Sequence, residues 1–156
     1  MTKGKTIILA TAVAGTLDLL SAFVFSALAP HPAGPDAIMR FVASGPLGDG
    51  ALTGASAYVL AGYIVHFAIM TCMVSAYVLI APSVPGLFRR PLVAGILYGL
   101  LLWVIMYWVV RPVRWPGMYP RSVLGVAEAW FSHIVCVGLP IAFIAWRHRA
   151  RSALSR

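Results

Sequence analysis

The sequence predicts an all-α protein: a transmembrane bundle of four helices with a short interfacial helix in the first loop. Hydrophobic residues make up 61% of the 156 residues and charged residues 10%, whereas soluble domains hold about 45–50% and about 25%. Four apolar runs nearly fill the chain, and each is long enough for the roughly 20 residues that a spanning helix needs. We therefore expect a single transmembrane domain over residues 1–156, with no room for a soluble domain.

The predicted spans are about residues 6–29, 51–81, 92–110 and 123–146. The first span ends in Ala27-Leu28-Ala29, so it also has features of a cleaved signal peptide. We favour a retained span because the run is long enough to cross a bilayer and carries Asp18 near its middle. Cleavage would leave three helices and would remove Asp18.

The first loop, residues 30–50, is rich in Pro and Gly but contains a segment that could form a short helix over residues 36–44. Pro35 suits its first turn and Gly45 its end. Asp36 and Arg40 have the i, i+4 spacing of an ion pair. Three apolar residues could rest on the membrane surface: Ile38, Phe41 and Val42. A solvated loop is the alternative.

The basic residues predict the orientation. Eight of the twelve Lys and Arg residues lie in the N-terminal segment, the 82–91 loop and the C-terminal tail, and four lie in the 30–50 and 111–122 loops. The positive-inside rule therefore places both termini in the cytoplasm, although Arg111, Arg114 and Arg121 oppose it. The net charge of +8 is thus typical of membrane flanks. We expect the lipid bilayer, and no nucleic acid, as a partner.

Three ionisable residues lie near the middle of three different spans: Asp18, His66 and His133. Such residues are costly inside a membrane and by default suggest a functional site. Glu128 lies five residues, or roughly 7 Å, nearer the outer surface. Asp18 and His133 each share a helix face with small residues, which predicts that both point into the bundle. The phase of His66 is ambiguous.

Several chemistries fit these three side chains. Asp18, His66 and His133 could bind a divalent metal, or His66 and His133 could be the axial ligands of a b-type haem. Asp18 with either histidine could relay protons. We favour a structural role over these chemistries, in which buried hydrogen bonds of the three side chains fix the helix register. No local ligand motif decides between them, so the cofactor stays unknown; a true site predicts Cα atoms within roughly 10 Å around a polar cavity.

Two neighbouring residues have simpler expected roles. Glu128 is expected to partner Arg111, Arg114 or Arg121 near the outer surface. Tyr98 is expected to pack with a satisfied hydroxyl.

Several short motifs occur in a familiar order: Gly15-Thr16-Leu17-Asp18, Ala43-Ser44-Gly45 with Gly48, His66, Tyr98-Gly99, and His133 with Gly138-Leu139-Pro140. This order resembles a family of small bacterial four-helix integral membrane proteins with no assigned function. The resemblance implies four helices and a bacterial inner membrane, and it implies no activity, substrate or cofactor. Membrane thiol oxidoreductases are excluded because Cys72 and Cys136 do not form the paired cysteines that they require.

Two classes of function remain. The first is a non-catalytic accessory or scaffold protein, which would hold other membrane subunits, or a second copy of itself, through its Gly and Ala faces. The second is a transporter, proton relay or metal- or haem-binding protein that uses Asp18, His66 and His133. An enzyme is the less favoured reading, since the sequence lacks a Gly-x-Ser-x-Gly motif and a phosphate-binding glycine loop.

Overall fold

The computed structural model describes residues 2–119 and 122–154, with side chains up to His148. It is 86% helical, and no strand occurs in the residues described. Four helical segments are long and apolar enough to cross a membrane: Lys3–Leu28, Ala57–Ser83, Pro91–Arg114 and Val123–His148. The predictions of an all-α fold and of four such helices are therefore confirmed.

The first helix, α1, is Lys3–Leu28, followed by α2, Pro35–Leu47, and α3, Gly50–Thr53. The second long segment consists of α4, Ala57–Ile80, and the 3₁₀ turn η1, Ala81–Ser83, after which comes α5, Pro85–Phe88. The third consists of α6, Pro91–Val104, the π-helical segment η2, Ile105–Val110, and α7, Arg111–Arg114. The fourth consists of α8, Val123–Trp130, the π-helical segment η3, Phe131–Gly138, and α9, Leu139–Leu154.

Two predicted boundaries differ from the observed ones. The second long segment begins at Ala57 rather than near residue 51, because the chain leaves helical geometry around Gly54 after the short α3. The third continues to Arg114 rather than residue 110.

Each π-helical segment ends two residues before a proline. Proline lacks the N–H that would bond the carbonyl four residues earlier, and its ring clashes with that carbonyl. For Pro112 that carbonyl belongs to Trp108 in η2, and for Pro140 it belongs to Cys136 in η3. The wider π-helical turn accommodates both effects without breaking the helix, so each segment stays long.

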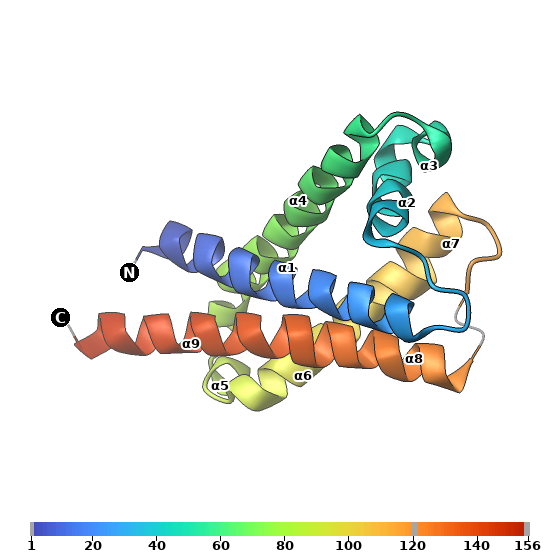
Figure 1. Cartoon of the computed structure of the whole chain (residues 1–156). Helices are drawn as coiled ribbons and strands as arrows, with labels where there is room; N and C mark the ends of the chain where they lie inside the picture. The colour runs from blue at the N-terminus through green and yellow to red at the C-terminus, as the bar shows by residue number, and fades with distance from the viewer. Residues whose placement is uncertain (1, 120–121, 155–156) are drawn as a thin grey trace.

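Figure 1 shows α1 beside α8 and α9, with the two ends of the chain at the same end of the bundle. The first long helix contacts α4 and also η3 and α9, while α6 packs against η3 and α9. Small and branched residues form the core between them, among them Ala10, Ala14, Val74, Val137 and Ile141. At the opposite end, α2, α3 and α7 gather where α1 ends and α8 begins. We call this the α2–α7 end.

Glycines allow the closest backbone contacts. A Cβ atom on Gly99 of α6 would lie 2.4 Å from the carbonyl oxygen of His133, and one on Gly62 of α4 would lie 2.1 Å from that of Met39. A Cβ atom on Gly138 would lie 2.2 Å from the carbonyl oxygen of Gly95, and one on Gly95 would lie 2.9 Å from Cα of Leu139. The faces that carry these four glycines are therefore occupied by contacts within the chain.

The short helix predicted in the first loop exists as α2, but it is longer than expected. It begins at Pro35, continues through Gly45 and Pro46, and ends before Gly48, whose φ of 85° is the left-handed conformation that favours glycine. Its Met39 and Ala43 are buried, and α2 packs against α4.

Arg40 on α2 binds backbone rather than Asp36. Its guanidinium donates hydrogen bonds to the carbonyl oxygens of Gly54 and, at 2.9 Å, Ala55. The predicted Asp36–Arg40 ion pair does not form in the described part of the chain. The exposed carbonyls that precede α4 are better partners because Arg40 reaches two of them at once.

Candidate functional site

The structure brings the three predicted residues into one region, each from a different helix. His66 of α4 contacts the carbonyl oxygen of Gly15, three residues before Asp18 on α1, and Ser132 of η3, next to His133, contacts Ser21, three residues after Asp18. Neither histidine approaches to the 4.0 Å of a direct ion pair. Asp18 and His133 are half-buried, and His66 is buried.

The inward direction predicted for Asp18 and His133 is confirmed by burial. Around Asp18, the small residues Ala14, Gly15 and Ser21 are buried, whereas Leu20 on the opposite face is 51% exposed. The ambiguity at His66 is also resolved, because the buried residues of α4 form one stripe with i, i+4 spacing: Gly62, His66, Met70, Val74 and Val78. All three side chains therefore belong to the interior.

His66 ties α4 to α1. Its Nε2 lies 2.9 Å from the carbonyl oxygen of Gly15, and because a carbonyl only accepts, Nε2 carries the proton. Gly15 permits this contact, since a Cβ there would lie 2.7 Å from the ring of Phe67. One ring nitrogen of His66 is thus already used in a helix–helix hydrogen bond.

His133 is oriented within its own helix. Its Nδ1 donates to the carbonyl oxygen of Ala129 at 3.0 Å, which leaves Nε2 as the nitrogen that can exchange a proton. The ring meets Tyr107 of η2 edge to face, with centroids 5.7 Å apart. The guanidinium of Arg111 lies 4.4 Å above the Tyr107 ring, a cation–π contact, and it also interacts electrostatically with His133.

A pair of serines joins α1 to η3 beside the site. The Ser21 and Ser132 hydroxyl oxygens lie 2.7 Å apart, and Ser21 also lies 2.7 Å from the carbonyl oxygen of Asp18. A serine hydroxyl has a single proton. Ser21 therefore donates to Asp18, and Ser132 donates to Ser21. The pair holds Asp18 next to the turn that carries His133.

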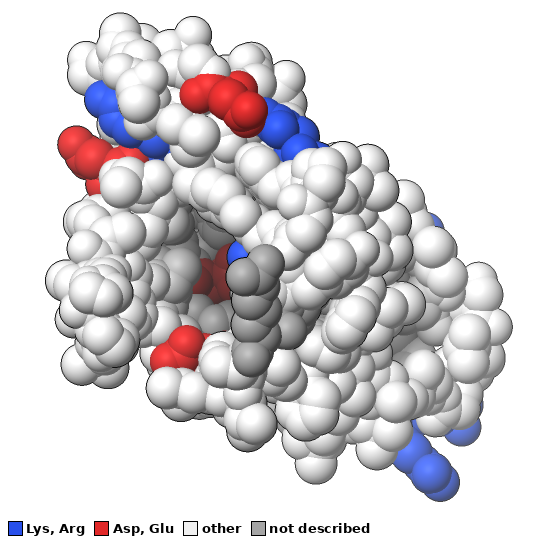
Figure 2. Space-filling model, turned by 90° about the vertical axis from the view of Figure 1, so that its right-hand side faces the viewer, with Lys and Arg blue, Asp and Glu red and all other residues white. Residues whose placement is uncertain are grey.

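The α2–α7 end of the bundle is hollowed. Figure 2 looks onto this end and shows a depression at its centre with acidic and basic side-chain atoms inside it. Asp18 and His133 are each about ten residues from this end of their segments, and Arg111 and Glu128 lie nearer to it.

The other half of the bundle is closed. Ala10, Ala14, Ile141 and Ala142 have no exposed surface. Polar groups nevertheless continue along the buried face of α1. The hydroxyl of Thr11 is buried with no hydrogen-bond partner among the described residues, and Thr6 lies 3.0 Å from Nδ1 of the buried His148.

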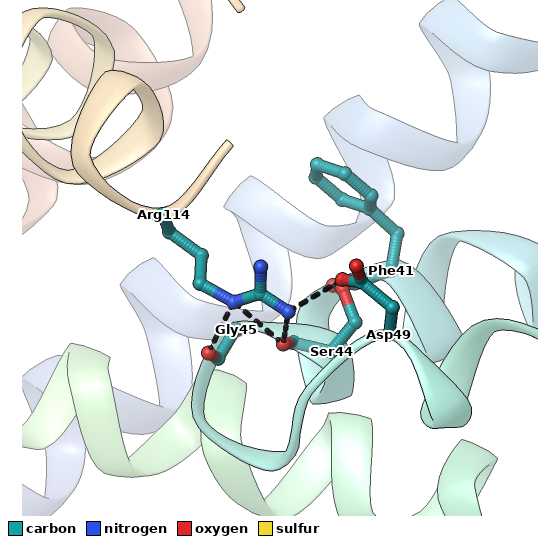
Figure 3. A network of polar contacts seen from close by, with 5 residues as sticks. All are labelled: Phe41, Ser44, Gly45, Asp49 and Arg114. Atoms are coloured by element: carbon teal, nitrogen blue, oxygen red, sulfur yellow. Dashed lines mark hydrogen bonds and ion pairs between the residues drawn. The ribbon is translucent and has the colours of Figure 1, made fainter. Parts of the chain in front are cut away.

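Arg114 holds the hollow end together (Figure 3). Its Nε donates to the carbonyl oxygens of Ser44 and Gly45 at 3.0 and 2.8 Å, and a terminal nitrogen lies 2.6 Å from Asp49 Oδ1. The carbonyls of Ser44 and Gly45 lie in the last turn of α2, where the helix dipole favours a cation. Phe41 and Trp115 stack beside this contact, with centroids 4.5 Å apart.

The expected partners of Glu128 are therefore taken by other groups. Arg114 pairs with Asp49 and Arg111 lies on Tyr107, so neither forms an ion pair with Glu128. The third expected partner, Arg121, lies outside the described residues. Tyr98 behaves as expected, since its hydroxyl donates to the Met73 carbonyl at 2.6 Å.

The geometry does not favour a metal or a haem. No group of three His, Cys, Asp or Glu side chains among the described residues is placed to hold a metal ion. The Nε2 of His66, which an axial haem ligand would use, donates to Gly15 instead. In this arrangement the described residues fit neither a metal ion nor a haem.

The sequence did not indicate Ser132 or Tyr107, and it predicted Glu128 as the partner of Arg111 or Arg114 instead of Tyr107 and Asp49. The i, i+4 spacing of Tyr107 and Arg111 was a usable signal, because such residues share a helix face. Ser132 and Arg114 find partners more than 60 positions away, and no local pattern indicates these contacts.

Comparisons with family models, with curated proteins and with solved structures gave no match. The function is therefore argued from the site alone.

Proposed function

We propose that this protein spans a membrane and relays protons through Asp18 and His133. The observation that carries the proposal is that Asp18 and His133 come from two different helices and flank the buried hydrogen bond between Ser21 and Ser132. Intramembrane carboxylate–histidine chains are typical of proton pathways in pumps and transporters. In this mechanism Asp18 and Nε2 of His133 exchange a proton through intervening water.

The path that we propose follows the buried face of α1. Protons enter by the hollow at the α2–α7 end (Figure 2) and pass from His133 to Asp18. Thr11, Thr6 and His148 mark the route through the closed half. His66, which donates to Gly15, acts as a positioning residue for α1.

The alternative of an accessory or scaffold protein stays a prediction. It was based on the Gly and Ala faces, and these are largely occupied inside the chain by contacts such as that of Gly99 with the His133 backbone. The placement of Asp18 and His133 on either side of the Ser21–Ser132 hydrogen bond gives the proton relay the more specific support.

For the orientation, we propose that both termini face the cytoplasm, and from the resemblance that the membrane is a bacterial inner membrane. At the end that bears the termini, basic residues are exposed: Lys3, Lys5, Arg89, Arg90 and Arg147. At the other end Arg40 and Arg114 are held by backbone carbonyls. The exposed positive charge is thus concentrated at the end that the positive-inside rule assigns to the cytoplasm.

The orientation is tested by thiol labelling of intact cells with a membrane-impermeant maleimide, in a background with Cys72→Ser and Cys136→Ser. His31→Cys should be labelled in intact cells, and Lys3→Cys only after the cells are permeabilised. The reverse pattern would contradict this orientation.

The function is tested with purified protein in vesicles that hold a pH-sensitive dye, under a potassium diffusion potential. The protein should speed the change in internal pH above that of protein-free vesicles. Asp18→Asn should return the rate to the protein-free level, and His133→Gln should lower it strongly.

The matched control is Asp36→Asn, the same chemical change at an exposed carboxylate on α2, which should leave the rate unchanged. Infrared difference spectroscopy of the Asp18 carboxyl band reports its protonation independently of flux. A wild-type rate equal to that of empty vesicles, or a folded Asp18→Asn variant with the full rate, would refute the relay.

A further inference from the structure

A groove of about 510 Å³ lies between α4, α5 and α6. Its volume is in the range of ligand-binding cavities, about 300–1,000 Å³. The walls are apolar side chains of α4, α5 and α6, among them Met73, Ile80, Phe88, Leu97 and Leu102. The two long helices meet across it at Tyr98, whose hydroxyl donates to Met73.

The length of the groove matches one leaflet of a bilayer. On the third long segment the lining residues run from Ala94 of α6 to Ile105, the first residue of η2, a rise of about 16 Å. Half of the hydrocarbon core of a typical bilayer is about 15 Å. A single acyl chain that enters from the α5 end would therefore find apolar walls along the depth of its own leaflet.

The α5 end of the groove carries positive charge. Arg89 and Arg90 are exposed, and they follow directly after Phe88, which lines the groove. A basic residue near the surface attracts anionic lipid by about 1 kcal/mol. The charge is thus placed where the head group of a lipid in the groove would lie.

We propose that the groove between α4 and α6 binds one acyl chain of an anionic phospholipid, whose phosphate lies against Arg89 and Arg90. The inference rests on the membrane location given under the proposed function and is independent of the proton relay. Zwitterionic lipid fits the same walls but lacks the net charge, so the head group provides the selectivity.

The test uses the unmodified protein in vesicles that contain phosphatidylglycerol or phosphatidylcholine with a photoreactive diazirine in one acyl chain. After illumination, mass spectrometry locates the adducts. We expect phosphatidylglycerol adducts on the groove segments, residues 72–88 and 94–105, to exceed those of phosphatidylcholine about five- to thirty-fold. The double variant Arg89→Gln, Arg90→Gln should remove this excess.

The matched control is Arg147→Gln, which removes an exposed arginine outside the groove and should preserve the excess. Adducts on apolar side chains elsewhere, such as Leu20 and Phe131, which are 51% and 48% exposed, should be equal for the two lipids. Equal labelling of the groove by both lipids would overturn the proposal. If the protein is labelled elsewhere but the groove carries no adducts, the lipid proposal is overturned, and a second copy of the chain in the groove becomes the favoured occupant. Absence of adducts everywhere would refute the membrane location itself.

Discussion

Ser132 of η3 donates a hydrogen bond to Ser21 of α1 across 2.7 Å, although 111 positions separate them. Both serines are buried, and they adjoin the two residues of the proposed relay, since Ser132 precedes His133 and Ser21 bonds the backbone of Asp18. A polar link between two helices at this depth sets the rotation of each helix about its axis. The serine pair thus positions the carboxylate and the imidazole without contacting either side chain.

Ser132→Ala is expected to lower the free energy of unfolding by about 1–2 kcal/mol, because Ser21 loses its buried donor. Proton flux should fall but not vanish, since Asp18 and His133 remain. Thermal unfolding in detergent and the vesicle assay measure the two effects. Ser75→Ala, at a half-buried position of α4, is the control, and equal behaviour of the two variants would contradict this role.

Gly99→Ala is expected to destabilise the bundle by about 1–3 kcal/mol or more, because the added Cβ would meet backbone atoms of His133 and Ile134 at 2.4 and 2.7 Å. The backbone cannot move aside as a flexible side chain would. Gly4→Ala is the control: nothing lies within 4 Å of its Cβ position, and Ala favours the helix there. Comparable losses of thermal stability in both variants would disprove the close packing of α6 on η3.

Arg114→Gln is expected to loosen α2 while leaving the four long segments folded, because the last carbonyls of α2 lose their cationic donor. Hydrogen exchange should increase selectively in residues 35–47. Asp49→Asn should have a smaller effect, since the bonds from Arg114 to Ser44 and Gly45 remain. If α2 exchanges as slowly as in the wild type, another contact, such as the stack of Phe41 on Trp115, holds it.

Tyr77→Phe and Tyr98→Phe make the same chemical change but should shift stability in opposite directions. The Tyr77 hydroxyl is buried without a hydrogen-bond partner in the described residues, so its removal should raise the unfolding free energy by about 1 kcal/mol. The Tyr98 hydroxyl donates to Met73, so its removal should lower the free energy by a similar amount. Thermal unfolding of both variants in the same detergent measures the two changes in stability. Changes of the same sign would refute this assignment of the hydroxyl contacts.

The sequence alone predicted the number of long helices and the inward faces of the first and fourth. Both are local properties. Hydrophobic length is read along one segment, and the side on which Gly15 and Ser21 fall relative to Leu20 follows from the helical period. The burial of these small residues and the exposure of Leu20 confirm the prediction.

Only the tertiary structure decided which residues meet. His66 faces α1 because α4 crosses α1 at Gly15. Arg114 finds its partners because α2 packs against α4, which places Asp49 and the end of α2 near α7. The energies of such contacts depend on the crossing of helices far apart in sequence. The depth of Asp18 and His133 in the bundle thus follows from their positions along the chain. The contact between Ser21 and Ser132, which aligns them, does not follow from the sequence.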